Sequence, residues 1–295
     1  MLLLHDPRCA DYGSAAHPEQ PRRVVATAEH LRSALPGAEW RTPSASAPDR
    51  VLLRAHTAAH LARLEEPRAF DADTAYFPGI AGHARRGVAS ALEASAHALA
   101  GKGPVLSLMR PPGHHACADA AMGFCYLNQV AVAALVAREA QGIERVAVWD
   151  FDAHHGNGTE AILHGREGFL VCSVHQSPCY PGTGLGDHGN SRNWPVAPGT
   201  PRALHMHALR EALEAVVAFK PGLILVSAGF DAYARDPITQ MTLEAEDFST
   251  LGRWLREAAL PAAAVLEGGY SPDLPVLVES FLSAWAPRDS GRGAF

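Results

Sequence analysis

The six residues from Asp150 to His155 place carboxylates and imidazoles at the end of a predicted strand. Alternate side chains of a β-strand share a face, so Asp150, Asp152 and His154 begin on one side of the chain. Carboxylate oxygen and imidazole nitrogen are ligand atoms that a catalytic divalent metal takes. Burying such groups without a partner ion is costly. The run therefore predicts a metal site, and a strand-end salt-bridge cluster is the alternative.

The composition indicates one large globular domain. The chain has 295 residues, of which 47% are hydrophobic, and these suffice for a sizeable core. Its apolar runs are shorter than a membrane span, and the N-terminus lacks the basic start and long apolar region of a signal peptide. The net charge of −6, without a basic block, argues against nucleic acid as a partner. We expect a cytoplasmic protein that binds neither membranes nor nucleic acid.

The five cysteines indicate reduced thiols rather than a disulfide framework. Their number is odd and none forms a CxxC pair, which is typical of a reducing compartment. Among the 16 histidines, His56 and His60 have the i, i+4 spacing of a helical ligand pair. They lack the glutamate of an HExxH motif, so we interpret both as ordinary helix residues.

Short apolar runs alternate with longer amphipathic stretches along the chain. This pattern predicts an α/β fold: a single domain with a central, mostly parallel sheet flanked by helices. We expect the catalytic domain to span residues 1–286 and residues 287–295 to form a flexible tail. The predicted strands are Leu2–His5, Val105–Met109, Val146–Phe151, Phe169–Val174, Leu223–Ser227 and Ala263–Leu266. The predicted helices are Arg85–Ala100, Leu127–Ala140, Pro201–Phe219 and Leu243–Ala259.

Polar residues follow five of these strands at their carboxyl ends. Open parallel sheets bind their ligands at this edge, so we expect the polar groups to meet in one site. The coincidence of five such groups strengthens the prediction of a metal site beyond what the first run supports alone. The groups are Arg110–His115, Asp152–Gly158, His175, Asp231 and Glu267–Tyr270.

Together these motifs resemble those of the zinc-dependent histone deacetylase family. That family includes bacterial deacetylase-like amidohydrolases and acetylpolyamine amidohydrolases. The matching segments are HPEQPRR (His17–Arg23), RPPGHHA (Arg110–Ala116), GFCYLN (Gly123–Asn128), WDFDAHHGNGT (Trp149–Thr159), SAGFDA (Ser227–Ala232) and EGGY (Glu267–Tyr270). The resemblance implies an enzyme that removes acetyl or other acyl groups from the ε-amine of lysine in proteins or peptides. Deacetylation of small acetylated polyamines is the alternative.

The resemblance implies that Asp152, His154 and Asp231 are the zinc ligands. Three protein ligands leave coordination positions open for catalysis. An oxygen-rich ligand set could also accept Fe²⁺, Co²⁺ or Mn²⁺. Because two carboxylates offset most of the zinc charge, such a site still needs a general base. The family's structural potassium site is matched by Asp150, Asp152, His154, Ser173 and Val174.

The resemblance makes His115 the general base for water and then the general acid for the leaving amine. His114 would orient groups and stabilise charge, with Asp150 as its carboxylate partner. Asn157 lies beside His115, where many members have aspartate. An amide fixes the tautomer without adding negative charge, so His115 should protonate less readily. Tyr270 would donate a hydrogen bond to the substrate carbonyl and to the developing oxyanion.

The resemblance also implies a narrow substrate pocket. Phe124 and Tyr180 match its two aromatic walls, which would grip a methylene stem by apolar contact. Ile238 replaces the glutamate that polyamine-selective eukaryotic members carry. An isoleucine cannot attract a distal ammonium, and this favours acyl-lysine as the substrate. The other matching positions are Gly123, which could accept the scissile amide hydrogen, Gly269, the rim aspartate Asp73 and a buried channel arginine, Arg23.

Several alternatives remain open from the sequence. Asp71 and Asp73 could serve an acetylpolyamine deacetylase, whose entrance is shaped by a homo-oligomer in bacterial relatives. A dimanganese ureohydrolase shares this general fold but needs ligands for a second metal. A non-catalytic acyl-lysine-binding module is disfavoured because every catalytic position is present. A serine or cysteine hydrolase is disfavoured because the chain has no GxSxG motif.

Overall fold

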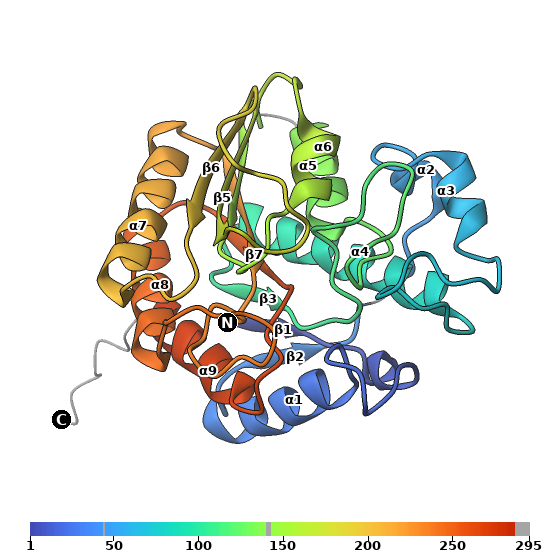
Figure 1. The fold of residues 1–295 in the computed structure, drawn as a ribbon, viewed down its shortest axis with the longest axis horizontal. Helices are drawn as coiled ribbons and strands as arrows, with labels where there is room; N and C mark the ends of the chain where they lie inside the picture. Colours follow the sequence, from blue (N-terminus) through green and yellow to red (C-terminus); the bar gives the residue numbers. More distant parts are fainter. Residues whose placement is uncertain (44, 140–142, 287–295) are drawn as a thin grey trace.

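Eight strands form one sheet in which every neighbouring pair runs parallel (Figure 1). The computed structural model describes residues 1–43, 45–139 and 143–286. The spatial order of the strands is β2-β1-β3-β8-β7-β4-β5-β6. Their bounds are β1 Leu2–Leu4, β2 Glu39–Arg41, β3 Val105–Ser107, β4 Val146–Asp150, β5 Phe169–Gln176, β6 Ser191–Val196, β7 Leu223–Ala228 and β8 Ala262–Leu266.

Helices cover both faces of this sheet (Figure 1). One face shares a core with α1 (Arg22–Ala34), α7 (Arg202–Ala218), α8 (Ala245–Ala258) and α9 (Leu274–Trp285). The other face packs against α2 (Asp49–Leu52), α3 (Ala58–Arg63), α4 (Ile80–Leu99), α5 (Gln129–Glu139) and α6 (Asn157–Leu163). A short 3-10 helix, Pro7–Ala10, follows β1.

Strand β4 shows why the central strands are apolar along their whole length. Val146 and Val148 belong to the core beneath α4 and α5, whereas Ala147 and Trp149 belong to the core beneath α7, α8 and α9. All five residues of β4 are buried. A strand covered on both faces buries every side chain, so its sequence is a continuous apolar run rather than an alternating one.

The predicted α/β fold with a parallel sheet is confirmed, and its six predicted strands are present with shifts of one or two residues at their ends. The sequence prediction missed the two edge strands, β2 and β6. Strand β2 is three residues long and carries two exposed charges, and β6 contains Pro195 and alternates buried with exposed residues. Edge strands commonly carry charges and proline, which weakens their pattern in the sequence.

The four predicted helices correspond to α4, α5, α7 and α8, whereas α1, α2, α6 and α9 were not predicted. Ala140, the last residue of one predicted helix, and the predicted flexible tail 287–295 lie outside the described residues. Within the described part of the chain, no helix combines the length and the apolar character that crossing a membrane requires. The five cysteines are all free thiols.

The sheet order brings the loops that carry polar residues together. Strands β3, β8, β7, β4 and β5 are consecutive neighbours in space, although the chain visits them in a different order. In parallel strands, the carboxyl ends lie at one edge of the sheet, so the five following loops meet there. The sequence expectation of one shared site therefore has a direct structural basis.

Candidate active site

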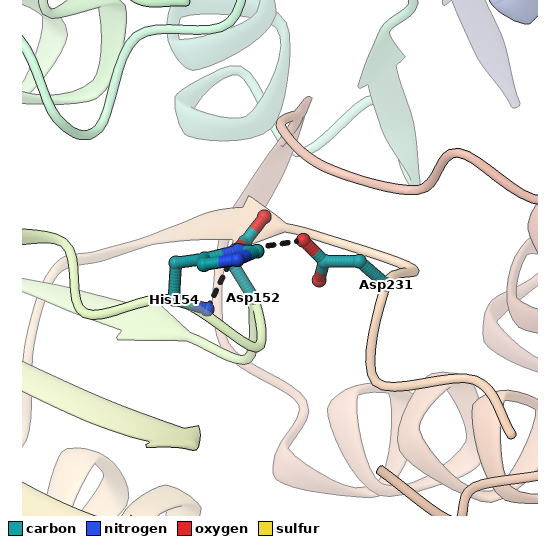
Figure 2. A group of neighbouring side chains, drawn as sticks. All are labelled: Asp152, His154 and Asp231. Carbon is teal, nitrogen blue, oxygen red and sulfur yellow. Dashed lines mark hydrogen bonds and ion pairs between the residues drawn. The ribbon is translucent and has the colours of Figure 1, made fainter. Parts of the chain in front are cut away.

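Asp152, His154 and Asp231 form a buried group with the geometry of a metal site. Figure 2 shows the three side chains gathered together, with Asp231 joined to the His154 ring by a dashed line. The His154 Nδ1 atom lies 3.1 Å from Asp152 Oδ1 and 2.9 Å from Asp231 Oδ2. The three ligand atoms all lie within 4.8 Å of one another. Atoms that bind one tetrahedral zinc at 2.0–2.2 Å stand about 3.3 Å apart, so this spacing fits such an ion.

Backbone amides hold the remaining oxygens of both carboxylates. Asp152 Oδ2 accepts a hydrogen bond from the Gly268 amide at 2.7 Å, and Asp231 Oδ1 accepts one from the Ala153 amide at 2.8 Å. Each carboxylate is thereby fixed by one oxygen and presents the other to His154. Fixed outer partners of this kind orient metal ligands before an ion binds.

Two glycines allow this close approach. A Cβ atom on Gly229 would lie 2.1 Å from Asp152 Oδ2, and one on Gly268 would lie 2.2 Å from Asp231 Oδ2. Any side chain at either position would displace a carboxylate of the group. The glycines of the SAGFDA and EGGY segments are therefore needed for the shape of the site, independently of turn conformation.

The charges of this group also fit a divalent cation. Burial, followed by the neighbouring Asp152, raises the pKa of Asp231. Burial tends to lower the pKa of His154, but hydrogen bonds to the two carboxylates outweigh it and raise that pKa well above its usual value. A proton on His154 thus offsets the buried negative charge. A bound cation would replace that proton, because buried carboxylates require a positive partner.

His114 is held by the aspartates of the same strand end. Its Nδ1 atom lies 3.1 Å from Asp150 Oδ2, and its Nε2 atom lies 3.7 Å from Asp152 Oδ1. Burial alone lowers the pKa of His114, but the carboxylates of Asp152 and Asp150 raise it to about 10. The structure therefore places Asp150 where the sequence comparison expects the partner of His114.

His115 is in the opposite electrostatic situation. Burial lowers its pKa well below the usual value, and the positive charges of His114 and His154 lower it further. Its Nδ1 atom donates a hydrogen bond to Asn157 Oδ1 at 2.8 Å. That bond places the proton on Nδ1 and leaves Nε2 as an acceptor. The tandem histidines thus differ in charge: His114 is cationic and His115 is neutral.

A cavity of about 360 Å³ opens above the metal group. His115, His154 and Tyr270 all line it, so the predicted base, one predicted ligand and the predicted hydrogen-bond donor face the same space. Of the predicted substrate-binding positions, Gly269 does not line this cavity; the others do, namely Asp73, Gly123, Phe124, Tyr180 and Ile238.

The aromatic walls depend on an unusual turn at Gly123 and Phe124. Both residues have positive φ angles, of 55° and 68°. A non-glycine residue in this region costs about 1–2 kcal/mol, and here the Phe124 amide donates a hydrogen bond to the Thr74 hydroxyl at 3.1 Å. A Cβ atom on Gly123 would lie 2.6 Å from the His115 ring. The turn therefore brings Phe124 into the pocket wall without displacing the base. On the other wall, the Tyr180 ring meets the His115 ring edge-on, with centroids 5.1 Å apart.

Tyr270 is fixed at its backbone and at its ring. Its amide donates a hydrogen bond to Asp236 Oδ2 at 2.7 Å, and the guanidinium of Arg23 lies 4.6 Å from the ring centroid. Arg23 also donates to the Gly269 carbonyl at 2.7 Å, so this predicted channel arginine is a clamp on the loop that carries the tyrosine. Burial raises the pKa of Tyr270 well above 10, and the hydroxyl remains a hydrogen-bond donor at neutral pH.

The sequence prediction missed several residues of the site. His17, Pro18 and Cys179 line the cavity, and Asp236 bonds the amides of both Tyr270 and Ile238. Only their position beside recognised motifs could have indicated them. His60 lies in α3, as expected. His56 precedes that helix, contrary to the prediction, and its ring bridges the Cys117 carbonyl and the Asn128 amide at 2.9 and 3.0 Å. The His56 ring thereby joins two loops of the site.

The sequence is similar to those of known proteins over most of its length. A family model described as histone deacetylase domain matches residues 17–285. The histone deacetylase-like amidohydrolase of Pseudomonas aeruginosa is 39% identical over 283 residues, covering 88% of this chain and 73% of that protein. The acetylpolyamine amidohydrolase of Mycoplana ramosa is 36% identical over 227 residues, covering 73% and 66%. The crystal structure of an acetylpolyamine aminohydrolase from Burkholderia pseudomallei matches with a TM-score of 0.85 at 28% identity, covering 97% of this chain and 98% of that one.

The geometry of the metal group predicts the effect of removing one of its charges. Asp231→Asn should weaken zinc binding by more than about 100-fold, since the loss of a ligand exceeds the loss of an outer partner. Competition with a chelating dye measures the affinity. Asp73→Asn removes the same charge at the cavity wall, outside the group, and should leave the affinity unchanged. Equal affinities of the two variants would contradict the assignment of Asp231.

Proposed function

The chain belongs to the histone deacetylase family, and from this we propose that it is a zinc-dependent amidohydrolase that deacetylates small N-acetylated amines of the polyamine type. One observation carries the proposal: the metal group, a neutral histidine and a protonated tyrosine all adjoin one cavity. These are the parts that hydrolysis of an unactivated amide needs, namely a Lewis acid, a general base and an oxyanion donor.

In the proposed mechanism, Asp152, His154 and Asp231 hold the zinc ion, which when bound polarises the amide carbonyl and lowers the pKa of water. His115 accepts the proton of the attacking water at Nε2, the ring nitrogen that its bond to Asn157 leaves free. It then returns this proton to the nitrogen of the leaving amine. The low pKa of His115 keeps its ring neutral, and so able to accept a proton, over the physiological pH range.

Tyr270 and His114 would stabilise or oppose charge that develops during the reaction, rather than transfer the proton. The Tyr270 hydroxyl donates a hydrogen bond to the amide oxygen, and the bond strengthens as negative charge develops there. Cationic His114 lies against His115, with ring centroids 4.1 Å apart. Its positive charge disfavours a second positive charge on His115, so the proton that His115 accepts is readily passed on to the amine.

The comparisons support small acetylated amines better than the acyl-lysine that the sequence analysis favoured. One relative and one solved structure carry acetylpolyamine hydrolase names. In the structure, Asp73 lines the cavity. Burial, followed by the carboxylate of Asp71, raises the pKa of Tyr180, and the carboxylate of Asp73 contributes less; this supports a negative potential at the pocket wall. A distal ammonium group on the substrate would be attracted there.

Acyl-lysine is the second candidate, and Ile238 favours it. This side chain lines the cavity and offers only apolar contact. A lysine side chain presents methylenes and no distal charge to such a wall. The relative named a histone deacetylase-like amidohydrolase agrees with this alternative. Both candidate substrates would be hydrolysed by the same mechanism. They differ in the chemical group that would contact the outer half of the pocket.

Some expectations remain proposals. Asp152, His154 and Asp231 form the one group with metal-ligand geometry among the described residues, which supports a single metal over a dimanganese centre.

We also propose potassium at the site matched by the resemblance. The residues assigned to it are all buried, namely Asp150, Asp152, His154, Ser173 and Val174. The cytoplasmic location and a homo-oligomeric state stay predictions.

The pairing of His115 with an amide predicts a pH effect. Asn157→Asp would place a carboxylate 2.8 Å from Nδ1 and favour the imidazolium, so the pKa of His115 should rise by about 1–3 units. The protonated ring cannot act as a base. The acid limb of the pH profile of kcat/KM should therefore move to higher pH by the same amount. An acid limb that stays in place, with zinc content unchanged, would contradict the role of His115.

The charge of Asp73 predicts substrate preference. N-acetylputrescine should have a higher kcat/KM than an acetyl-lysine peptide. Asp73→Asn should lower kcat/KM for N-acetylputrescine by roughly 1.4- to fivefold, since an exposed charge pair contributes about 0.2–1 kcal/mol. N-butylacetamide has the same stem without the ammonium and should be unaffected by the substitution. Tyr270→Phe supplies the background rate. A preference for the peptide, with no effect of Asp73→Asn, would instead favour the acyl-lysine candidate.

A further inference from the structure

The carboxylate of Glu267 has no part in the hydrolytic mechanism, although it is fully buried (0% exposed) beside the site. It opens the loop after β8 that also carries Tyr270, and it does not line the substrate cavity. A buried carboxylate that does not touch substrate must be satisfied by the protein itself. The partners of Glu267 therefore indicate its role.

One oxygen of this carboxylate holds the turn that carries the tandem histidines. Glu267 Oε2 accepts hydrogen bonds from the amides of Gly113, at 2.6 Å, and of His114, at 3.1 Å. These are consecutive amides immediately before His115. Bonds to two successive amides restrain both the position and the orientation of the turn, and so the direction in which the next side chain projects.

The backbone of Glu267 is itself fixed. Its amide donates to the Ala228 carbonyl at 3.0 Å, and its carbonyl accepts from the Arg23 guanidinium at 2.5 Å. The next residue, Gly268, donates its amide to Asp152 Oδ2 at 2.7 Å. The backbone that carries this carboxylate is therefore joined to the metal group on one side. On the other side it is joined to Arg23, which also holds the loop of Tyr270.

The two oxygens of the Glu267 carboxylate differ in a way that allows a sharp test. Oε2 accepts both bonds, whereas Oε1 is buried and has no hydrogen-bond partner among the described residues. Burial raises the pKa of Glu267 to about 7. A glutamine can supply the same accepting oxygen, whereas a methionine of similar length supplies none.

We propose that Glu267 is a positioning residue for the general base. Through the amides of Gly113 and His114, it holds the His115 side chain at a fixed position relative to the metal group and Tyr270. The inference rests on the proposed function, because it assumes that His115 accepts the proton. Glu267 contacts the turn and not the cavity, so its loss should affect turnover rather than substrate binding.

The test compares Glu267→Gln and Glu267→Met with the wild-type enzyme in their zinc-loaded forms, using N-acetylputrescine and an acetyl-lysine peptide. Glu267→Met should lower kcat by about 100-fold, the effect of a misplacement of about 1 Å, and leave KM within about twofold. Glu267→Gln should keep kcat within about threefold of wild type, because it retains the accepting oxygen. Zinc content and thermal unfolding, measured on the same samples, report whether metal binding and folding are intact.

Three results would overturn the assignment: an unchanged kcat in Glu267→Met, an equal loss in Glu267→Gln, or a loss that appears in KM alone. If the methionine variant does not fold, Glu267→Asp takes its place. It withdraws the oxygen by one methylene and must lower kcat at constant KM. If the wild-type enzyme turns over neither substrate, both the proposed function and this inference are wrong. If the wild type is active and Glu267→Met is equally active, only the inference is wrong.

Discussion

The burial of two carboxylates at the edge of one parallel sheet is the constraint on which the rest of the structure depends. Asp152 and Asp231 stand at the ends of neighbouring strands, with 1% and 0% of their surface exposed. Such groups require a cation and fixed hydrogen-bond donors. The amides of Gly268 and Ala153 supply the donors, and glycines at 229 and 268 supply the space. The carboxylates of Asp152 and Asp150 raise the pKa of His114, and the positive charge of His114 in turn helps burial to lower the pKa of His115.

A second buried network joins the loops around this centre. Glu19 pairs with Arg110, at the start of the turn that carries the tandem histidines, and with Arg23, which clamps the loop that carries Tyr270. The turn that carries His115 and the loop that carries Tyr270 are therefore tied to one ionic cluster. Rigid support of this kind matters because small displacements of reacting groups cost large factors in rate.

The sequence was sufficient to predict the central strands and most of the residues that meet at the candidate site, because the signals there are long and local. The run from Val146 to Asn157 contains a buried strand, two of the three residues of the metal group and the hydrogen-bond partner of His115 within twelve positions. Asp236 and Cys179 belong to no such run, and they come to the site only through folding. The same applies to the bond between Glu267 and the amide of Gly113, which joins residues 154 positions apart. Edge strands such as β2 were missed because their exposed charges mask the apolar pattern.

We propose that a single metal ion, held by Asp152, His154 and Asp231, drives amide hydrolysis. Adding zinc in known amounts to the metal-free enzyme tests this, with the rate of acetate release recorded from N-acetylputrescine and from an acetyl-lysine peptide. The rate should rise linearly and stop rising at one zinc per chain. A break at two metal ions per chain, or no acetate release from either substrate at any zinc level, would contradict it.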